Sequence, residues 1–163
     1  DFRDYARLPA PAPSRLDLNA LVKDVLALYE TSRVPIAKRL AHDLPAVWAD
    51  GAQIRQVIHN LVQNAQDSLE NARQSGAVAA IEVRTELAGD RVRLAVSDNG
   101  GGFPEELMAR IFEPYVTTKP RGTGLGLAIV KKIVDEHHGS VAIENRPSRG
   151  ASVSVLLPLA KAA

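Results

Sequence analysis

Apolar residues recur at helical spacing in three stretches of the chain, which follow Asp17, Asp50 and Gly126. Since residues three and four places apart share one face of an α-helix, each stretch predicts a helix with one buried side. Asp17 or Ser14 is placed to cap the first helix, and Asp50 with Gln53 has the spacing of a capping box in the second. The apolar positions are Leu18, Leu21, Val22, Val25, Leu26 and Tyr29 in the first helix, Ile54, Val57, Ile58, Leu61, Val62, Ala65 and Leu69 in the second, and Ala128, Ile129, Val130, Ile133 and Val134 in the third.

Alternation of apolar and polar residues predicts two β-hairpins. Residues 80–87 and 91–97 form the first around Gly89, and residues 140–144 and 151–157 form the second. Residues 34–40 and 46–49 are shorter extended segments. Pro35 lacks an N–H group and confines the earlier one to a sheet edge, so we expect two peripheral strands.

The segments on either side of the third helix have their own signals. Residues 103–121 are long, polar and basic, and they predict a lid or mobile loop with a short helix near residues 105–111. Gly139 is expected to end the third helix. His137 and His138 would then lie in its last turn, where carbonyl groups favour cations.

Composition narrows the classes of function. The 163 residues fit one domain, and the absence of cysteine excludes disulfides, thiolate zinc sites and a cysteine nucleophile. A net charge of +1, with acids and bases interspersed, argues against a nucleic-acid partner. No apolar run approaches the roughly 20 residues of a membrane span. We therefore expect a soluble, cytoplasmic domain, although a longer parent can be anchored in a membrane.

The second helix carries amide and carboxylate side chains beside its apolar stripe: Asn60, Asn64 and Asp67. Asn60 and Asn64 are four places apart and project from one face. Asparagine is a poor helix former, so the pair needs a reason. One reason is a hydrogen-bonded pair on a half-exposed face, and the other is a set of oxygen ligands for a hard cation such as Mg²⁺.

Two glycine-rich segments suggest a ligand. Residues 122–127 read Gly-Thr-Gly-Leu-Gly-Leu and lead into the third helix, whose N-terminal N–H groups would attract a phosphate. Asp98 precedes Gly100, Gly101 and Gly102 at the end of a predicted strand, where a carboxylate can face a pocket. Each segment alone is also compatible with an ordinary tight turn.

Taken in order, these signals resemble the nucleotide-binding domain of sensor histidine kinases, within the ATPase group of Hsp90, type II topoisomerases and MutL. The resemblance covers residues 17–158. Residues 60–65 are similar to its N box, 98–102 to its G1 box, 112–115 to its F box and 122–127 to its G2 box. Gly150, Ala151 and Ser152 stand where the last glycine motif is expected.

The resemblance implies an α/β (α+β) two-layer sandwich: a mixed, mainly antiparallel sheet of about five strands, covered on one face by three helices, with an ATP lid. Asp98 would accept a hydrogen bond from the adenine amino group, Asn64 would coordinate Mg²⁺, and Ser152 would support the adenine contact. Asn60, Lys119 and Arg121 are the candidate catalytic residues. The implied nucleotide-binding residues are Asn60, Asn64, Asp67, Asp98, Gly100, Gly102, Phe112, Gly122, Thr123, Gly124, Leu125, Gly126 and Ser152.

Residues 1–16 resemble the end of a kinase dimerisation helix and its linker, particularly in nitrogen-regulation sensors of the NtrY type. Phe2, Tyr5 and Leu8 have helical spacing, and three prolines follow them. A disordered terminus is the alternative. Residues 17–163 would then be the catalytic and ATP-binding domain. Its implied partners are the histidine-bearing dimerisation domain of the same parent and, indirectly, a response regulator.

The implied activity is donation of the ATP γ-phosphate to a histidine on that other domain. An ATP-hydrolysing clamp is the first alternative, but those hydrolases carry a glutamate where this chain has Asn60, and an amide cannot accept a proton from water. A non-catalytic nucleotide-sensing module and a serine kinase of the anti-sigma type are the others. None of the four histidines of the chain, His42, His59, His137 and His138, resembles a phosphoacceptor.

Overall fold

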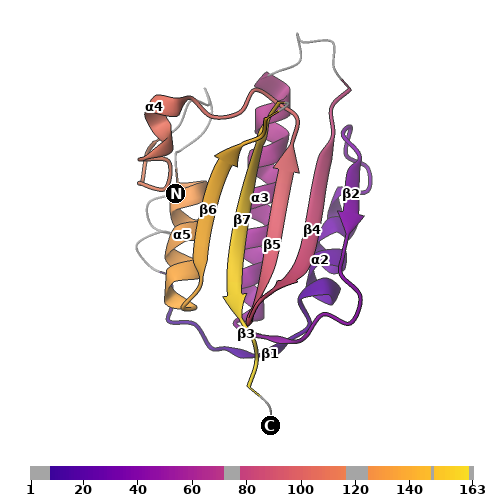
Figure 1. Cartoon of the computed structure of the whole chain (residues 1–163), viewed down its shortest axis with the longest axis vertical. Helices are drawn as coiled ribbons and strands as arrows, with labels where there is room; N and C mark the ends of the chain where they lie inside the picture. The colour runs from indigo at the N-terminus through magenta and orange to yellow at the C-terminus, as the bar shows by residue number, and fades with distance from the viewer. Residues whose placement is uncertain (1–7, 72–77, 117–124, 148, 162–163) are drawn as a thin grey trace.

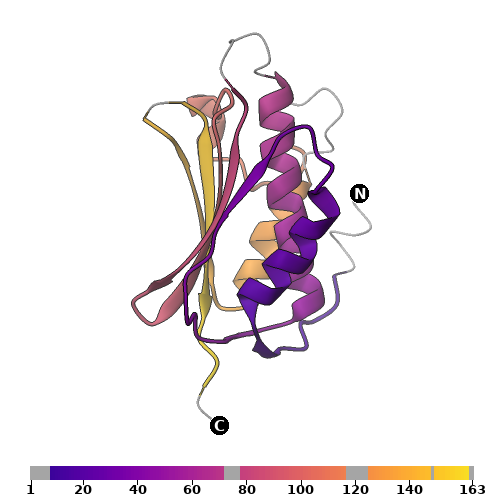
Figure 2. The ribbon, with the colours of Figure 1, turned by 90° about the vertical axis from the view of Figure 1, so that its right-hand side faces the viewer.

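The computed structural model describes residues 8–71, 78–116, 125–147 and 149–161. The elements are β1 (Ser14–Leu16), α2 (Leu18–Leu26), η1 (Ala27–Tyr29), β2 (Ile36–Arg39), β3 (Val47–Ala49), α3 (Gly51–Asn71), β4 (Ile81–Ala88), β5 (Arg91–Asp98), α4 (Glu105–Met108), α5 (Gly126–Glu136), β6 (Ser140–Asn145) and β7 (Ala151–Pro158). Figures 1 and 2 show two layers, with α2, α3 and α5 on one face of a twisted sheet. Within the described residues, the predicted sandwich is confirmed.

The sheet has the strand order β2-β4-β5-β7-β6. β2 runs parallel to β4, and the other neighbouring strands pair antiparallel. β2 lies at the edge, as Pro35 predicted. Both hairpins form, and the first turns at Gly89 with a positive φ of 64°. The sequence did not predict β1, which pairs with β3 in a separate two-stranded sheet.

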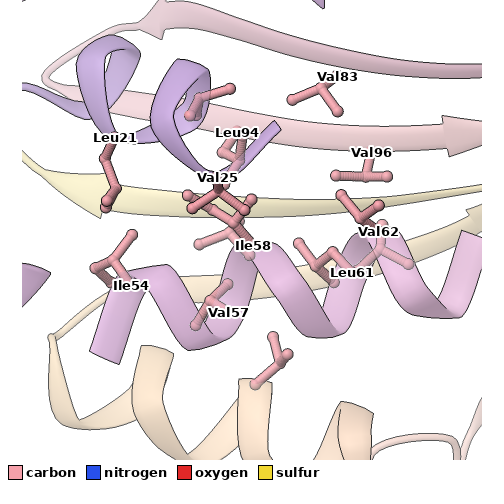
Figure 3. Close-up of a cluster of buried hydrophobic side chains, with 14 of the residues drawn as sticks. Leu21, Val25, Ile54, Val57, Ile58, Leu61, Val62, Val83, Leu94 and Val96 are labelled. Atoms are coloured by element: carbon pink, nitrogen blue, oxygen red, sulfur yellow. The ribbon is translucent and has the colours of Figure 1, made fainter. Parts of the chain in front are cut away.

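The core lies between the inward face of the sheet and the apolar stripes of the helices. Figure 3 shows Leu94 and Val96 of β5 facing Ile58 and Val62 of α3. Complete burial of such a side chain contributes about 1.5–3 kcal/mol, so this layer is the main source of stability. None of α2, α3 and α5 lies on the opposite face of the sheet in Figure 2, and the residues of that face alternate with the buried ones.

The caps of α2 and α3 are only partly as predicted. The Asp17 carboxylate accepts from the Ala20 N–H at 3.0 Å, which confirms it as the cap of α2. Asp50 caps α3 by accepting from Ala52 and Gln53 N–H groups at 3.0 and 3.2 Å. The second hydrogen bond of a capping box would run from the Asp50 N–H to the Gln53 side chain. That prediction is wrong, because the Gln53 amide donates to the Pro9 carbonyl at 2.8 Å instead.

The Asp50 N–H, which a capping box would pair with Gln53, is bound by His137 instead. The Asp50 N–H donates to His137 Nε2 at 3.0 Å, so the proton of this ring is on Nδ1, which donates to the Ile133 carbonyl at 2.8 Å. The side chain is only 4% exposed. The predicted role as a cation at the end of α5 is therefore wrong for His137, which is a neutral link between two helix ends.

The end of α5 also differs in detail from the prediction. His138, with φ of 60°, has the left-handed conformation that ends the helix, one residue before the predicted Gly139. The N–H groups of His138 and Gly139 bond to the Asp135 and Val134 carbonyls, a Schellman arrangement. Gly139 is required for a different reason, since a Cβ there would lie 2.2 Å from the Leu156 carbonyl oxygen. The short helix α4 ends at Met108, three residues before its predicted end.

Candidate nucleotide-binding site

Asp98, the central predicted site residue, lies at one end of the sheet. The C-terminal half of α3, the last residue of β5 and the turn between β6 and β7 meet there, at the top of Figure 1. The predicted residues Lys119, Arg121, Gly122, Thr123 and Gly124 lie outside the described residues, as does the proposed helix remnant before Leu8.

Asp98 is the central charged group of this end. It terminates β5 on the helix-covered face, and it is 3% exposed. Its Oδ1 accepts from the Gly100 N–H at 2.8 Å and from the Ser68 hydroxyl at 3.0 Å. Burial raises the pKa of this carboxyl, although hydrogen bonds from Gly100, Ser68 and Ala151 and the charge of Arg146 act in the other direction. The fold therefore retains a buried acceptor whose charge it only partly compensates.

Two glycines allow three segments of the chain to meet at Asp98. A Cβ on Gly100 would lie 2.5 Å from Ser68 Oγ and 2.7 Å from the Ser68 carbonyl oxygen. A Cβ on Gly150 would lie 2.0 Å from the Asp98 carbonyl oxygen, and the φ of Gly150 is +89°. Both contacts are closer than any side chain permits, so these positions need glycine for packing even without a ligand.

The turn between β6 and β7 is joined to the glycine segment by side chains that sequence reasoning missed. Arg146 Nη1 donates to the Asp98 carbonyl at 3.2 Å, and Arg149 Nε donates to the Gly100 carbonyl at 3.1 Å. Asn145 pairs with both backbone groups of Phe103, at 2.8 and 2.9 Å. The sequence offered only a basic turn before Gly150 as a signal.

Ser152 does not join Asp98. It pairs in register with Ser97, whose hydroxyl donates to the Ser152 hydroxyl at 3.0 Å on the face of the sheet without helices. The neighbouring Ala151 is buried on the same side as Asp98, and its N–H bonds to that carboxylate. Ser152 therefore points away from Asp98, because neighbours on a strand point to opposite faces, and its contact with adenine stays a prediction.

The two predicted asparagines of α3, Asn60 and Asn64, have different surroundings. Asn60 Oδ1 accepts from Gln56 at 2.7 Å, and Asn60 Nδ2 donates to the carbonyl of Gly126, the first residue of α5, at 3.1 Å. Asn60 thus connects the two helices where the glycine-rich segment ends. Asn64 lies one turn further along and is 7% exposed.

Two further predicted residues belong to α3 and to the segment after α4. The Asp67 carboxylate accepts from Gln63 at 3.1 Å. Phe112, beyond α4, is half-buried.

The start of α5 is suited to an anion. The helix begins at Gly126, its N-cap residue Leu125 makes no side-chain capping bond, and the first acidic residue comes late in the helix. Backbone N–H groups at such an end carry a partial positive charge. The helix start predicted from the glycine pattern is confirmed at Gly126.

The donor set fits one kind of Mg²⁺ site. Among the described residues no cluster of three or more His, Cys, Asp or Glu side chains could hold a metal. Mg²⁺ commonly takes one or two protein ligands and completes its shell with phosphate oxygens and water. The Asn64 amide on the buried side of α3 suits a cation that arrives with phosphates, and not a cage made by protein alone. None of the described helices is long and apolar enough to cross a membrane.

Comparison with known proteins agrees with this geometry. Residues 49–161 match the family described as histidine kinase-, DNA gyrase B-, and HSP90-like ATPase. An NtrY-like sensor histidine kinase of Rickettsia conorii is 39% identical over 161 residues, which are 98% of this chain and 26% of the relative.

Solved structures give the same result. The catalytic domain of histidine kinase ThkA superposes with a TM-score of 0.77 at 35% identity, over 91% of this chain and 96% of that domain. Full-length ShkA, solved in complex with AMPPNP, gives a TM-score of 0.82 at 30% identity, over 98% of this chain and 34% of ShkA. The chain spans about a quarter of the length of the full relatives such as the Rickettsia kinase. It belongs to the histidine kinase-, DNA gyrase B- and HSP90-like ATPase family, and within that family it is similar to the catalytic domains of NtrY-like and other sensor histidine kinases.

Proposed function

We propose that the domain binds Mg²⁺-ATP between α3 and α5 and donates the γ-phosphate to a histidine on a separate dimerisation domain of the same parent protein. The observation that carries the proposal is the buried Asp98 carboxylate, held at the end of β5 by glycine-dependent contacts. A buried charge that the fold only partly compensates is expected at a functional site.

Asp98 would select adenine. A carboxylate accepts a hydrogen bond from the 6-amino group of adenine, whereas guanine presents a carbonyl oxygen at that position and would be repelled. A hydrogen bond to a charged group contributes about 1.5–3 kcal/mol, which corresponds to roughly ten- to over a hundredfold in affinity. GTP should accordingly bind poorly.

The phosphates would lie at the N-terminus of α5, with Gly124 and Gly126 allowing the lid and the helix to approach them. Asn64 would hold the Mg²⁺, which supplies charge neutralisation when bound. Lys119 and Arg121 remain proposed contacts of the γ-phosphate because of their charge and position in the sequence. In the transfer itself, an imidazole nitrogen of the other domain bonds to the γ-phosphorus while the bond to the β–γ bridging oxygen breaks and ADP leaves.

Asn60 favours transfer over hydrolysis. Its amide cannot act as a general base, and both its oxygen and its nitrogen are engaged, with Gln56 and Gly126. We assign to Asn60 the role of bracing α5 against α3 beside the phosphates. An ATP-hydrolysing clamp would need a carboxylate at this position.

The partners follow from the same proposal. The dimerisation domain of the parent is the direct partner, and a response regulator would receive the phosphate from it, in the cytoplasm. ThkA, which shares the fold, has also been solved in complex with a response regulator protein. The principal alternative is a nucleotide-sensing module that docks on a partner without transferring phosphate.

Phosphotransfer from γ-labelled ATP tests the proposal. The domain is incubated with Mg²⁺ and labelled ATP, alone and with the dimerisation domain of the parent. We expect acid-labile, base-stable label on the added domain and none on this chain, with the signal lost in an Asp98→Asn control. Label on this chain alone would contradict the assignment of its histidines, and unlabelled dimerisation domain would favour the sensing module.

A further inference from the structure

Ser68 is the side chain of α3 that reaches the adenine-selecting carboxylate. It lies one helical turn after Asn64, and its hydroxyl donates to Asp98 Oδ1 at 3.0 Å. The Gly100 N–H donates to the same oxygen at 2.8 Å. Ser68 also packs closely on the glycine turn, where a Cβ on Gly100 would lie 2.9 Å or less from three of its atoms. Ser68 therefore contacts both the Asp98 carboxylate and the backbone turn at Gly100.

These contacts limit how Asp98 can present itself. An ionised carboxylate has about four acceptor positions on its two oxygens. Two donors on Oδ1, one from a helix and one from the turn, act together with the Ala151 N–H to fix the rotation of the carboxylate plane. The acceptor capacity for a ligand then lies mainly with Oδ2. If the Ser68 hydroxyl were absent, only the backbone N–H groups of Gly100 and Ala151 would hold the plane, and the direction of Oδ2 would be less fixed.

We propose that Ser68 is a positioning residue for adenine recognition, whose hydroxyl holds Asp98 so that the second carboxylate oxygen accepts from the 6-amino group. The proposal rests on the function proposed above, because it concerns how that site selects its base. It goes further in assigning purine selectivity to a pair, Ser68 and Asp98, that joins α3 to β5.

A purely structural role for Ser68 makes a different prediction. If the hydroxyl only joined α3 to β5, its loss would loosen the whole pocket and weaken every nucleotide alike. If the hydroxyl acts through Asp98 on one substituent of the base, its loss should matter only for nucleotides that carry that substituent. The 6-amino group is therefore the variable to change.

Calorimetry with two nucleotides separates these roles. ATP is compared with purine riboside triphosphate, which lacks only the 6-amino group, on the wild-type domain and on Ser68→Ala. We expect Ser68→Ala to weaken ATP about three- to tenfold and to change the affinity of the analogue less than about twofold. Ser154→Ala is the matched control, since it removes a hydroxyl from β7 in register with Ala95 on the face without helices; it should change neither affinity.

Ser68→Thr keeps the hydroxyl and tests the same point independently of Ser68→Ala. It should retain the wild-type preference for ATP over the analogue. Equal weakening of both nucleotides by Ser68→Ala, unchanged ATP affinity in Ser68→Ala, or loss of the preference in Ser68→Thr would each overturn the proposal.

The wild-type measurement distinguishes a failure of the proposed function from a failure of the role proposed for Ser68. If the wild-type domain binds ATP and the analogue equally well, adenine recognition through Asp98 is wrong, and with it the function proposed for the site. If the wild type prefers ATP by about tenfold or more while Ser68→Ala keeps that preference, only the role of Ser68 is wrong.

Discussion

The fold shifts the pKa values of two aspartates near opposite ends of α3 in opposite directions. Asp50 stands at the N-terminus of the helix, where N–H groups of Ala12, Gln53 and Ala52 donate to its carboxylate, and the pKa of Asp50 is lowered, chiefly by the bond from Ala12. Asp98 lies beside the C-terminal half of the helix, and burial raises its pKa. The protein stabilises the first charge by its own hydrogen bonds and leaves the second incompletely compensated.

The surroundings of the two carboxylates extend the contrast. Around Asp50, hydrogen bonds connect the segment after Leu8, the start of α3 and the end of α5 through Pro9, Gln53 and His137. Around Asp98, glycines create close approaches, and burial raises the pKa of the carboxyl that we assign to the ligand. Substitutions at the Asp50 end should therefore reduce stability and spare nucleotide binding, whereas those at the Asp98 end should do the reverse.

The largest stability loss is expected from His137→Ala. The change leaves the Asp50 N–H and the Ile133 carbonyl without this ring and opens a cavity at a nearly inaccessible site. We expect the free energy of unfolding to fall by about 2–4 kcal/mol, with ATP affinity changed less than about twofold. Urea denaturation and calorimetry measure the two quantities. His138→Asn is the control, since it replaces an exposed neighbour by a residue that tolerates a positive φ. A loss of ATP affinity that matched the loss of stability would remove the distinction between the two ends.

Asp98→Asn should produce the converse result. The asparagine can still accept from Ser68 and Gly100, but its amide nitrogen opposes the 6-amino group of adenine. ATP affinity should fall roughly ten- to over a hundredfold. The free energy of unfolding should stay equal or increase, because a buried charge is removed. Normal ATP binding, or a destabilised protein, would contradict the assignment of Asp98 to the ligand.

Asn64→Ala tests whether the functional end of α3 includes the cation. The Mg²⁺-dependent part of ATP affinity should fall by roughly tenfold, while ADP without Mg²⁺ should bind as before, because an amide ligand matters only when a cation bridges the phosphates. Gln63→Ala removes an exposed amide from the preceding position of the helix and serves as control. Equal loss for both nucleotides would argue that Asn64 shapes the pocket without binding metal.

The sequence predicted those features that depend on local pattern. The apolar stripes of α2, α3 and α5 and the two hairpins follow from periodicity, and the order of the glycine motifs placed Asp98 and Asn64 at one site. β1 was missed because three residues are too few to show alternation, and its strand partner lies in β3.

Other misses depended on distant partners or on a single register. The residues next to His137 in the sequence suggested a cation at the end of a helix. Its hydrogen-bond partner, the Asp50 N–H, is 87 positions away in the sequence. The bond from Ala151 to Asp98 was not predicted, because a shift of one residue reverses the face of a strand and the sequence pointed only to Ser152. Ser68 gave no signal, since a serine on a helix is common and only the approach of Gly100 reveals its contact.

The smallest expected effect is a difference in pH dependence between the two aspartates. The pKa of Asp50 is lower in the folded protein than the usual aspartate value of about 3.9 in the unfolded chain. Between the two values the unfolded chain binds more protons. The ionised Asp50 carboxylate therefore stabilises the fold above about pH 3.9, and this stabilisation is lost as the pH falls through the folded-state pKa. For Asp98, whose folded-state pKa is raised, the folded protein binds more protons, so its contribution becomes less favourable as the pH rises through the interval between the two values. Relative to the wild type, Asp50→Asn should therefore be less stable near neutral pH, with the gap closing as the pH falls through the lowered pKa of Asp50, while Asp98→Asn should gain relative stability as the pH rises. Since Asp50 is only half-buried and solvent screens its charge, its gap should not exceed about 1 kcal/mol. Urea denaturation at several pH values measures both differences, and slopes of the same sign for the two variants would refute the contrast between the two ends of α3.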